Sequence, residues 1–225
     1  MPERPIAHRV TESPDPTRVL KLLKGYLGSA LPSVSEIARI SPGPFQILIS
    51  TMISLRTKDD VTLAASRRLF GRAPDAGSVT RLSIDEIAAL IFPCGFYRTK
   101  AVNIQKAAQS VLKAGGVPRT REELVALPGV GPKTASLTLG LAFGVPAICV
   151  DTHVHRISNR IGWVQTTSPE ATEAALELHL PRRYWIETNE ILVAFGQRIC
   201  TPQSPRCSEC PAAQHCPKVG VTRSR

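Results

Sequence analysis

The sequence predicts an all-α protein, and three observations lead to this fold class. Apolar residues recur every three or four positions along most of the 225-residue chain, as in residues 19–27, which is the spacing that gathers them on one face of a helix. Ser83 with Glu86, and Thr120 with Glu123, have the spacing of capping boxes at helix starts. No stretch shows the alternation of apolar and polar residues that is typical of a half-buried strand.

Glycine and proline divide the chain into a series of short and medium helices. Residues 45–55 are almost continuously apolar, so we expect a helix that is buried on all sides. Thr167 with Glu170 forms a third capping-box pair, and Pro169 suits an early helical position. Residues 74–79 are expected to form a loop. The predicted helices cover residues 19–27, 35–40, 45–55, 61–69, 84–91, 101–112, 122–127, 134–143, 154–161, 169–180 and 184–195.

The most informative stretch is Leu127–Ala135, in which two prolines and two glycines surround Val130. Because glycine adopts positive φ at little cost, Gly129 and Gly131 permit a sharp reversal between two helices. Pro132 suits the first position of the second helix, where a backbone N–H would have no partner in any case. The pattern predicts a helix–hairpin–helix. The N–H groups and the positive dipole end of its second helix would bind an anion such as a DNA phosphate.

Lys133 falls in the first turn of that second helix. A helix N-terminus disfavours an additional positive charge, and a neutral lysine amine is a nucleophile toward carbonyl-like carbon atoms. Lys133 is therefore a candidate nucleophile. The alternative is a solvated lysine that contacts one phosphate, because most lysines are exposed.

Asp151 ends the apolar run 147–150 and precedes the helix predicted over 154–161. It can serve as the N-cap of that helix, and it can also steer protons or stabilise a cation near Lys133. The two roles are compatible, since a carboxylate at a helix start keeps its charge. His153 and His155 are two residues apart, diverge on a helix, and therefore make a poor metal pair.

The C-terminal region contains four cysteines within a short segment, with six, two and five residues between successive members: Cys200, Cys207, Cys210 and Cys216. In a reducing compartment, metal binding is favoured over disulfides. Four thiolates at this spacing fit either zinc or an iron–sulfur cluster. Cys94 and Cys149 stand apart in apolar surroundings, and we expect them to be inert core residues.

The formal net charge of +10, from 28 lysines and arginines against 18 aspartates and glutamates, favours a polyanionic partner such as nucleic acid. Residues 1–17 contain four prolines among charged residues and are expected to be flexible. They include no apolar core of a signal peptide, and no stretch has the length of a membrane span. We therefore expect no secretion and no membrane association.

The hairpin stretch, the segment Val-Asp-Thr-His-Val-His-Arg at residues 150–156 and the cysteine spacing together resemble endonuclease III. This family belongs to the helix–hairpin–helix DNA glycosylase superfamily, and the resemblance extends from about Val19 to Cys216. It implies two helical domains that flank a DNA cleft. Residues 36–145 would form a six-helix barrel with the helix–hairpin–helix. Residues 18–35 and 146–225 would form an iron–sulfur cluster domain.

The resemblance also implies a bifunctional DNA glycosylase and AP lyase of base excision repair. Such an enzyme excises oxidised pyrimidines from duplex DNA and cleaves the abasic site by β-elimination. Lys133 matches the family's nucleophile, Asp151 its catalytic aspartate, and the four C-terminal cysteines the ligands of a [4Fe–4S] cluster. The expected DNA contacts around the hairpin and the aspartate are Gly129, Val130, Gly131, Thr134 and His153.

Two further residues match positions that enter the DNA in the family. Arg56 stands in a loop where the family commonly carries glutamine, a residue that fills the gap left by the flipped base. We hypothesise that Arg56 also fills this gap but prefers guanine as the orphaned base, through its acceptors. Phe96 resembles the second wedge, on the other strand. The alternative for Phe96 is an ordinary core phenylalanine.

Two other functions stay open on the sequence alone. One is a mismatch-specific glycosylase of the same superfamily, for thymine or adenine, although Lys133 argues against the adenine type. The other is a non-catalytic DNA-binding module, against which the coexistence of Lys133 and Asp151 argues. The expected partner is double-stranded DNA with a damaged base or an abasic site, bound by a monomer. The expected location is the cytoplasm, in association with the nucleoid, of a bacterium or archaeon.

Overall fold

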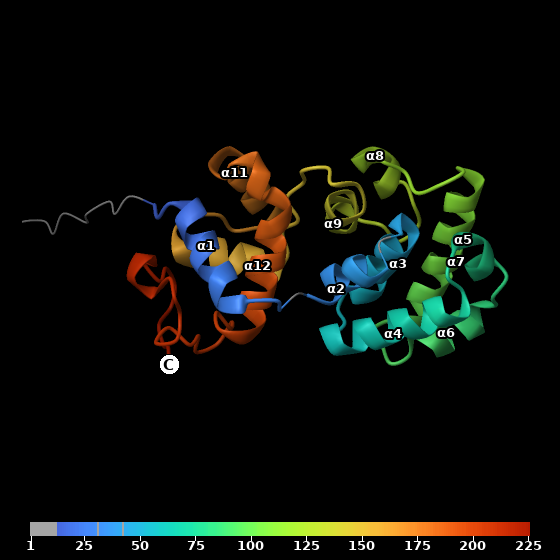
Figure 1. Ribbon diagram of the computed structural model, residues 1–225, viewed down its shortest axis with the longest axis horizontal. Helices are drawn as coiled ribbons and strands as arrows, with labels where there is room; N and C mark the ends of the chain where they lie inside the picture. Colours follow the sequence, from blue (N-terminus) through green and yellow to red (C-terminus); the bar gives the residue numbers. More distant parts are fainter. Residues whose placement is uncertain (1–12, 31, 42) are drawn as a thin grey trace, which may run out of the picture.

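The computed structural model describes residues 13–30, 32–41 and 43–225, and within these residues it contains helices and no strand. The prediction of an all-α fold is confirmed. Figure 1 shows the helices gathered into two lobes that lie side by side along the longest axis. Each lobe has its own cluster of buried apolar side chains. The second lobe contains the helix before Gly28 and those after Asp151, and the first lobe contains the helices between Ser33 and Phe143.

The first lobe is built around a helix that is buried on nearly all sides. This helix is α3 (Pro44–Ser54), in which every residue from 47 to 53 is buried, as its continuous apolar sequence predicted. The surrounding helices are α2 (Ser33–Ile40), α4 (Asp59–Arg72), α5 (Ala76–Thr80), α6 (Ile84–Ile91), α7 (Tyr97–Lys113), α8 (Arg121–Val125) and α9 (Pro132–Phe143). Among them, α2, α4, α7 and α9 pack directly against α3.

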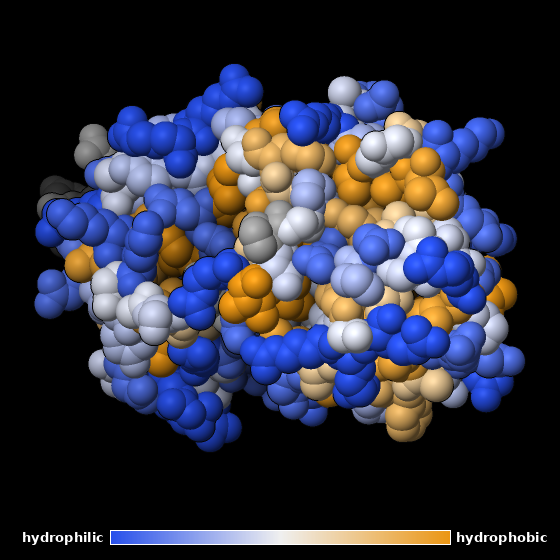
Figure 2. Space-filling model, turned by 45° about the vertical axis from the view of Figure 1, so that its right-hand side comes forward, coloured by the Kyte–Doolittle hydropathy of each residue, from blue (hydrophilic) through white to orange (hydrophobic). Residues whose placement is uncertain are grey.

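The second lobe combines the start of the described chain with its C-terminal third. It consists of α1 (Pro16–Leu27), α10 (Thr152–Ile161), α11 (Pro169–His179), the 3₁₀ helix η1 (Arg182–Tyr184), α12 (Trp185–Arg198) and the 3₁₀ helix η2 (Ala213–His215). Leu20 and Leu23 of α1 share a core with Ile157, Leu192 and Phe195. Figure 1 shows α1 lying beside α12, and Val221 of the C-terminal segment lines one cavity with Leu23 of α1 and Phe195 of α12. In Figure 2, hydrophilic residues cover most of this lobe on the face shown.

Several helix starts differ from the sequence-based expectations, and three of these differences have an identifiable cause or bear on a predicted segment. Residues 74–79 were expected to form a loop, but α5 begins there because Asp75 and Ser78 cap each other, with serine at the position where capping boxes usually carry glutamate or glutamine. Ser168 caps α11, although Thr167 was expected to do so. The helix α1 begins at Pro16, inside the segment 1–17 that was expected to be flexible; residues 1–12 lie outside the described residues.

No helix in the described part of the chain combines the length and the apolar character that a membrane span requires.

Candidate active site and cysteine-lined cavity

A cleft of about 600 Å³ lies where the two lobes meet. One wall comes from α2, from the loop between α3 and α4, and from α9, and the other comes from α10 and α12. The charged residues on its walls are Arg56, Lys58, Asp59, Asp60, Lys133 and Asp151. The candidate nucleophile, the candidate catalytic aspartate and one candidate wedge residue therefore share one cavity.

Lys133 and Asp151 approach each other in this cleft from opposite lobes. Lys133 is the second residue of α9, after Pro132 at the first position, and its side chain is 43% exposed. Its Nζ lies 3.8 Å from Oδ2 of Asp151. The other carboxylate oxygen, Oδ1, accepts hydrogen bonds of 2.9 Å from the backbone N–H groups of His153 and Val154. Asp151 is thus the N-cap of α10 and the partner of Lys133 at the same time.

The chain before Asp151 is fixed from both sides. Ile148, Cys149 and Val150 are buried between the lobes. The Asn189 side chain on α12 donates a hydrogen bond of 2.9 Å to the carbonyl of Cys149, and the Cys149 thiol points to the carbonyl of Lys133 at 3.6 Å. Burial raises the pKa of Cys149 to about 12, which agrees with the expectation of an inert core thiol. These contacts fix the backbone that carries Lys133 and Asp151.

The two glycines of the hairpin between α8 and α9 have different structural roles. Gly129 has a φ of +77°, and a Cβ atom there would lie 2.8 Å from Asn103, so both the conformation and the space require glycine. Gly131 has an extended backbone with a φ of −98°, and no atom within 4 Å would meet its Cβ. The sequence-based view that both glycines serve the reversal is therefore correct only for Gly129. Gly131 leaves the N-terminus of α9 open to an approaching group.

The side chains of Val130 and Thr134 are buried, at 6% and 1% exposure, so both can present only backbone groups to a ligand. His153 lies on the cleft wall and is half-buried, and burial lowers its pKa below the ordinary value. Its Nδ1 is 3.1 Å from a guanidinium nitrogen of Arg156. That same nitrogen donates to the carbonyls of Gly196 and Cys200 at 3.1 and 2.8 Å. Arg156 therefore links the wall of the cleft to the first of the four C-terminal cysteines.

Arg56 and Phe96 lie next to each other at the edge of the first lobe. The guanidinium carbon of Arg56 is 5.5 Å from the centre of the Phe96 ring, which is a cation–π distance. Both residues have a left-handed backbone, with φ of 52° and 57°. Phe96 is 63% exposed, so the alternative of a core phenylalanine is wrong.

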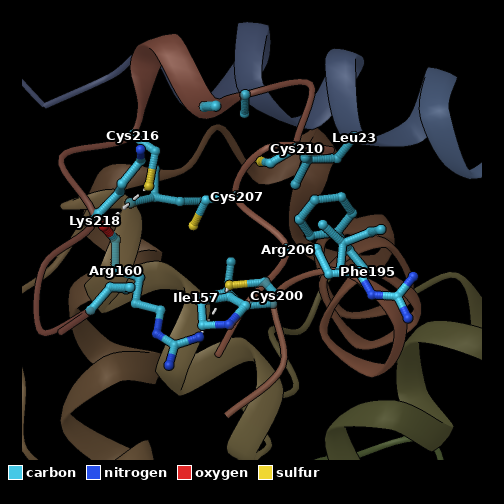
Figure 3. A pocket seen from close by; sticks show the side chains of 16 residues that line it. Leu23, Ile157, Arg160, Phe195, Cys200, Arg206, Cys207, Cys210, Cys216 and Lys218 are labelled. Atoms are coloured by element: carbon cyan, nitrogen blue, oxygen red, sulfur yellow. Dashed lines mark hydrogen bonds between the residues drawn. The ribbon is translucent and has the colours of Figure 1, made fainter. Parts of the chain in front are cut away.

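The four C-terminal cysteines line one cavity in the second lobe, together with apolar side chains that include Leu23, Ile157 and Phe195 (Figure 3). Arg160 contributes to its wall: its guanidinium lies 3.4 Å from the sulfur of Cys200, and its carbonyl lies 3.4 Å from the sulfur of Cys216. All four thiols are partly exposed, whereas Cys94 and Cys149 are buried.

The arrangement of these thiols bears on the choice between zinc and an iron–sulfur cluster. Within the described residues, no group of three or more His, Cys, Asp or Glu side chains is arranged to hold a metal ion. A tetrahedral zinc site draws its four ligands around one ion, whereas a [4Fe–4S] cluster binds each thiolate at a different iron atom. Four cysteines around one cavity supply the four thiolates that either kind of site requires.

A comparison with protein families agrees with this geometry. The family profile of the HhH-GPD superfamily, described as base excision DNA repair proteins, matches residues 49–182, which include the hairpin, Lys133 and Asp151. The chain belongs to the HhH-GPD superfamily. Endonuclease III of Thermotoga maritima is an HhH-GPD relative that is 46% identical over 175 residues, which cover 77% of this chain and 82% of the relative.

Two more HhH-GPD relatives support the predicted resemblance to endonuclease III. The chloroplastic endonuclease III homolog 2 of Arabidopsis thaliana is 47% identical over 190 residues, and the match spans 78% of this chain but only 48% of the plant protein. A solved structure of a trapped covalent intermediate of endonuclease III with DNA has a TM-score of 0.80 and 34% identity, over 90% of this chain and 94% of that chain. The resemblance is confirmed.

Sequence reasoning missed three side chains that organise this HhH-GPD site: Lys100, Arg156 and Asn189. Each donates hydrogen bonds to backbone carbonyls that lie more than 35 positions away in the sequence. A polar residue on a helix face gives no local sign of such a distant acceptor. For Lys100, the only signal is its place in the first turn of a helix that begins at the Phe96 turn.

Proposed function

We propose that this chain is a bifunctional DNA glycosylase and AP lyase of the endonuclease III type. Its substrate would be duplex DNA with an oxidised pyrimidine, and it would cleave the resulting abasic site by β-elimination. The observation that carries the proposal is the distance of 3.8 Å between Lys133 Nζ and Asp151 Oδ2 in a cleft between two lobes. The covalent DNA intermediate of a relative with the same fold supports it.

The proposed chemistry begins with a nucleotide that is flipped out of the duplex into the cleft. The Lys133 amine attacks C1′ of the sugar, so a carbon–nitrogen bond forms and the bond between C1′ and the base breaks. The base leaves with the bonding electrons and takes up a proton. The amine then loses a proton, the bond between C1′ and the ring oxygen O4′ breaks, and O4′ takes up a proton to become a hydroxyl, which leaves a Schiff base between C1′ and the lysine nitrogen.

The second half of the reaction breaks the strand. The Schiff base withdraws electrons, so a proton at C2′ can be removed, and the bond from C3′ to the phosphate oxygen breaks by β-elimination. Water then hydrolyses the Schiff base and returns Lys133. Asp151 would accept the proton of the attacking amine and stabilise the positive charge that develops on the sugar, because Oδ2 is the carboxylate oxygen that faces Nζ.

The remaining site residues would hold and shape the DNA. The open N-terminus of α9, at Gly131, would bind a backbone phosphate through its N–H groups, together with the amides of Gly129, Val130 and Thr134. His153 would contact DNA from the other wall of the cleft. Arg56 and Phe96 would enter the duplex on its two strands, with Arg56 favouring guanine opposite the lesion through a bidentate contact to its acceptors.

We further propose that Cys200, Cys207, Cys210 and Cys216 hold a [4Fe–4S] cluster. When bound, such a cluster would cross-link the C-terminal segment and order it against α1 and α10. The half-exposed Arg206, between the first two cysteines, would then be presented toward DNA. We also propose that residues 36–145 form one domain and that residues 18–35 with 146–225 form the other. The presence of one buried apolar cluster in each range supports this division, although α2, which begins at Ser33, packs in the first lobe.

Borohydride trapping tests the proposed function. The protein is mixed with duplex DNA that carries thymine glycol or an abasic site, and the Schiff base is reduced to a stable amine. We expect covalent complexes with both substrates, and none for Lys133→Ala. Lys106→Ala, which removes an exposed lysine from α7, is the matched control and should be trapped like the wild type.

Other outcomes identify the alternatives. A complex with the abasic site alone would leave the lyase in place and assign a different base. Base release without strand cleavage, from a thymine mismatch for example, would indicate a monofunctional glycosylase. DNA binding without any reaction would indicate a binding module. For Arg56, the test is Arg56→Gln: an unchanged preference for the opposite base would contradict the proposed contact with guanine.

A further inference from the structure

Lys100 is a buried lysine outside the catalytic cleft. It lies in the first turn of α7, is 8% exposed, and is absent from the residues that line the cleft. Its Nζ donates to the carbonyls of Ile53 and Leu55, both at 2.6 Å, and to the hydroxyl of Thr57 at 2.8 Å. An ammonium group has three donors and no acceptor. All three donors of Lys100 are therefore used, and all three acceptors belong to the end of α3 and the loop that follows it.

These acceptors come from a place where the backbone needs a partner. The last carbonyls of a helix have no intrahelical donor and carry the negative end of the helix dipole. Lys100 supplies a positive charge to the carbonyls of Ile53 and Leu55 at the end of α3. The next residue, Arg56, has a left-handed backbone with a φ of 52°, a conformation that persists only when surrounding contacts hold it.

The Arg56 loop (residues 55–58) also touches the Phe96 turn (residues 92–96). The Thr57 hydroxyl that accepts from Lys100 accepts a second hydrogen bond, of 3.2 Å, from the backbone N–H of Gly95. A Cβ atom on Gly95 would lie 2.4 Å from the carbonyl oxygen of Arg56, so only glycine allows this approach. Lys100 lies one helical turn after Phe96, and its backbone N–H donates a hydrogen bond to the carbonyl of Phe96.

Lys100 thus joins two loops that each present one exposed side chain. We propose that Lys100 is a positioning residue that fixes the Arg56 loop and the Phe96 turn as one rigid unit, and so sets the spacing at which Arg56 and Phe96 enter the DNA. This inference rests on the proposed function for the DNA-entering roles of both residues. Lys100 is not a second nucleophile, because its amine is enclosed by its three acceptors and does not face the cleft.

The test compares DNA substrates that do and do not require insertion into a duplex. Lys100→Met keeps the length of the side chain but removes its donors. We expect strand cleavage at an abasic site to fall at least about tenfold in duplex DNA, the loss expected when a buried charge–dipole contact is removed. Cleavage of the same site in single-stranded DNA should change little, because no partner strand has to be displaced. Lys100→Arg, which keeps the charge, should recover part of the duplex activity.

Thr57→Val with its matched control Thr57→Ser provides a second variant pair, in case Lys100→Met folds poorly. Valine removes the hydroxyl that joins Lys100 to Gly95, whereas serine keeps it. We expect valine, but not serine, to lower the ratio of duplex to single-strand cleavage. An equal loss on both substrates would show that Lys100 only stabilises the fold, and an unchanged ratio in Lys100→Met and Thr57→Val would also overturn the proposal.

A readout that needs no catalysis separates this proposal from the proposed function. Duplex DNA with a non-cleavable abasic-site analogue carries the fluorescent base 2-aminopurine next to that site. Binding of the wild type should raise the fluorescence, since insertion of the two side chains unstacks the neighbouring base. Lys100→Met should bind with a smaller rise. If the wild type raises fluorescence but cleaves nothing, the proposed function fails and the positioning role stands. If both proteins give the same rise, the positioning role fails.

Discussion

Asp151 and Lys133 face each other across the boundary between two lobes that have separate apolar cores. The two carboxylate oxygens of Asp151 have different partners. Oδ1 accepts hydrogen bonds from two backbone N–H groups at the start of α10, and Oδ2 lies 3.8 Å from the Nζ of Lys133. The capping hydrogen bonds therefore orient the other carboxylate oxygen of Asp151 toward the amine of Lys133. Because the lobes meet at this pair, the distance between Lys133 and Asp151 depends on how the lobes pack, and a change in either helix start will affect it.

Asp151→Asn separates the two roles of this side chain. Asparagine caps helices as well as aspartate does, so the free energy of unfolding should change by less than about 0.5 kcal/mol. The amide cannot accept the proton of Lys133, so the rate of base excision should fall by roughly 10²- to 10⁴-fold. Urea denaturation and single-turnover excision assays measure the two effects.

The matched control for this variant is Ser168→Ala, which removes the N-cap of α11 in the same lobe. It should cost about 1 kcal/mol of stability and leave the excision rate unchanged. If Asp151→Asn instead loses stability and activity in parallel, Asp151 acts as a cap alone.

The two hairpin glycines should respond differently to alanine. Gly129→Ala forces a side chain into the left-handed region and against Asn103, so we expect a stability loss of about 1–3 kcal/mol. Gly131→Ala meets no atom of the protein, so it should fold normally but bind DNA more weakly, because its Cβ stands where the phosphate would approach. Thermal unfolding and titration with duplex DNA measure the difference. Normal DNA affinity in Gly131→Ala would exclude a phosphate at this helix end.

Gly196 in α12 lies against the link between the cleft and the cysteines. A Cβ there would be 2.6 Å from His153 Nδ1 and 3.0 Å from a guanidinium nitrogen of Arg156. Gly196→Ala should displace both side chains and cost about 1–3 kcal/mol. Gly71→Ala in α4 is the matched control: it meets no atom within 4 Å and should gain roughly 0.5–1 kcal/mol. Equal stabilities of the two variants in urea would show that Arg156 does not hold this position.

The six cysteines should fall into two classes in an alkylation experiment. Burial raises the pKa of Cys149 to about 12, so at pH 8 only about 10⁻⁴ of this thiol is in the reactive thiolate form. Burial also raises the pKa of Cys94. After chelation of the proposed cluster, iodoacetamide should modify the four partly exposed C-terminal cysteines and spare both core thiols, which the reagent cannot reach, as mass spectrometry would detect. Burial also raises the pKa of Cys210 to about 11 and raises that of Cys216, so these two should react slowly. Modification of Cys149 in the folded protein would contradict this.

The parts of the fold that depend on local sequence were predictable. The buried helix 45–55 and the hairpin at Leu127–Ala135 follow from apolar continuity and from glycine and proline placement, and the structure has helices at both places. The start of α5 was missed because Ser78 replaces the usual glutamate of a capping box. A capping-box pattern that requires glutamate or glutamine three residues after the cap overlooks Ser78, which makes the same reciprocal hydrogen bonds with Asp75.

Parts of the site that depend on packing between distant segments were not predictable. The sequence placed Lys133 and Asp151 in two separate motifs, and no local pattern fixed the distance between them. Nothing in the composition around Lys100 indicates that the end of α3, more than 40 positions earlier, supplies its acceptors. The left-handed backbone of Arg56 and Phe96 is equally invisible, since neither residue favours positive φ.

Lys100 should make the stability of the fold depend on pH in a defined direction. Burial lowers the pKa of Lys100 from 10.5 to about 8. Between these values the unfolded chain binds a proton that the folded chain has released, so the free energy of unfolding should rise with pH from about 8 to about 10.5. Lys100→Met lacks this group. The stability of the wild type relative to Lys100→Met, measured by urea denaturation, should therefore increase across this window. A constant difference would mean that the three oxygen acceptors keep the ammonium protonated and the pKa of Lys100 near its ordinary value, and a falling difference would place that pKa above it.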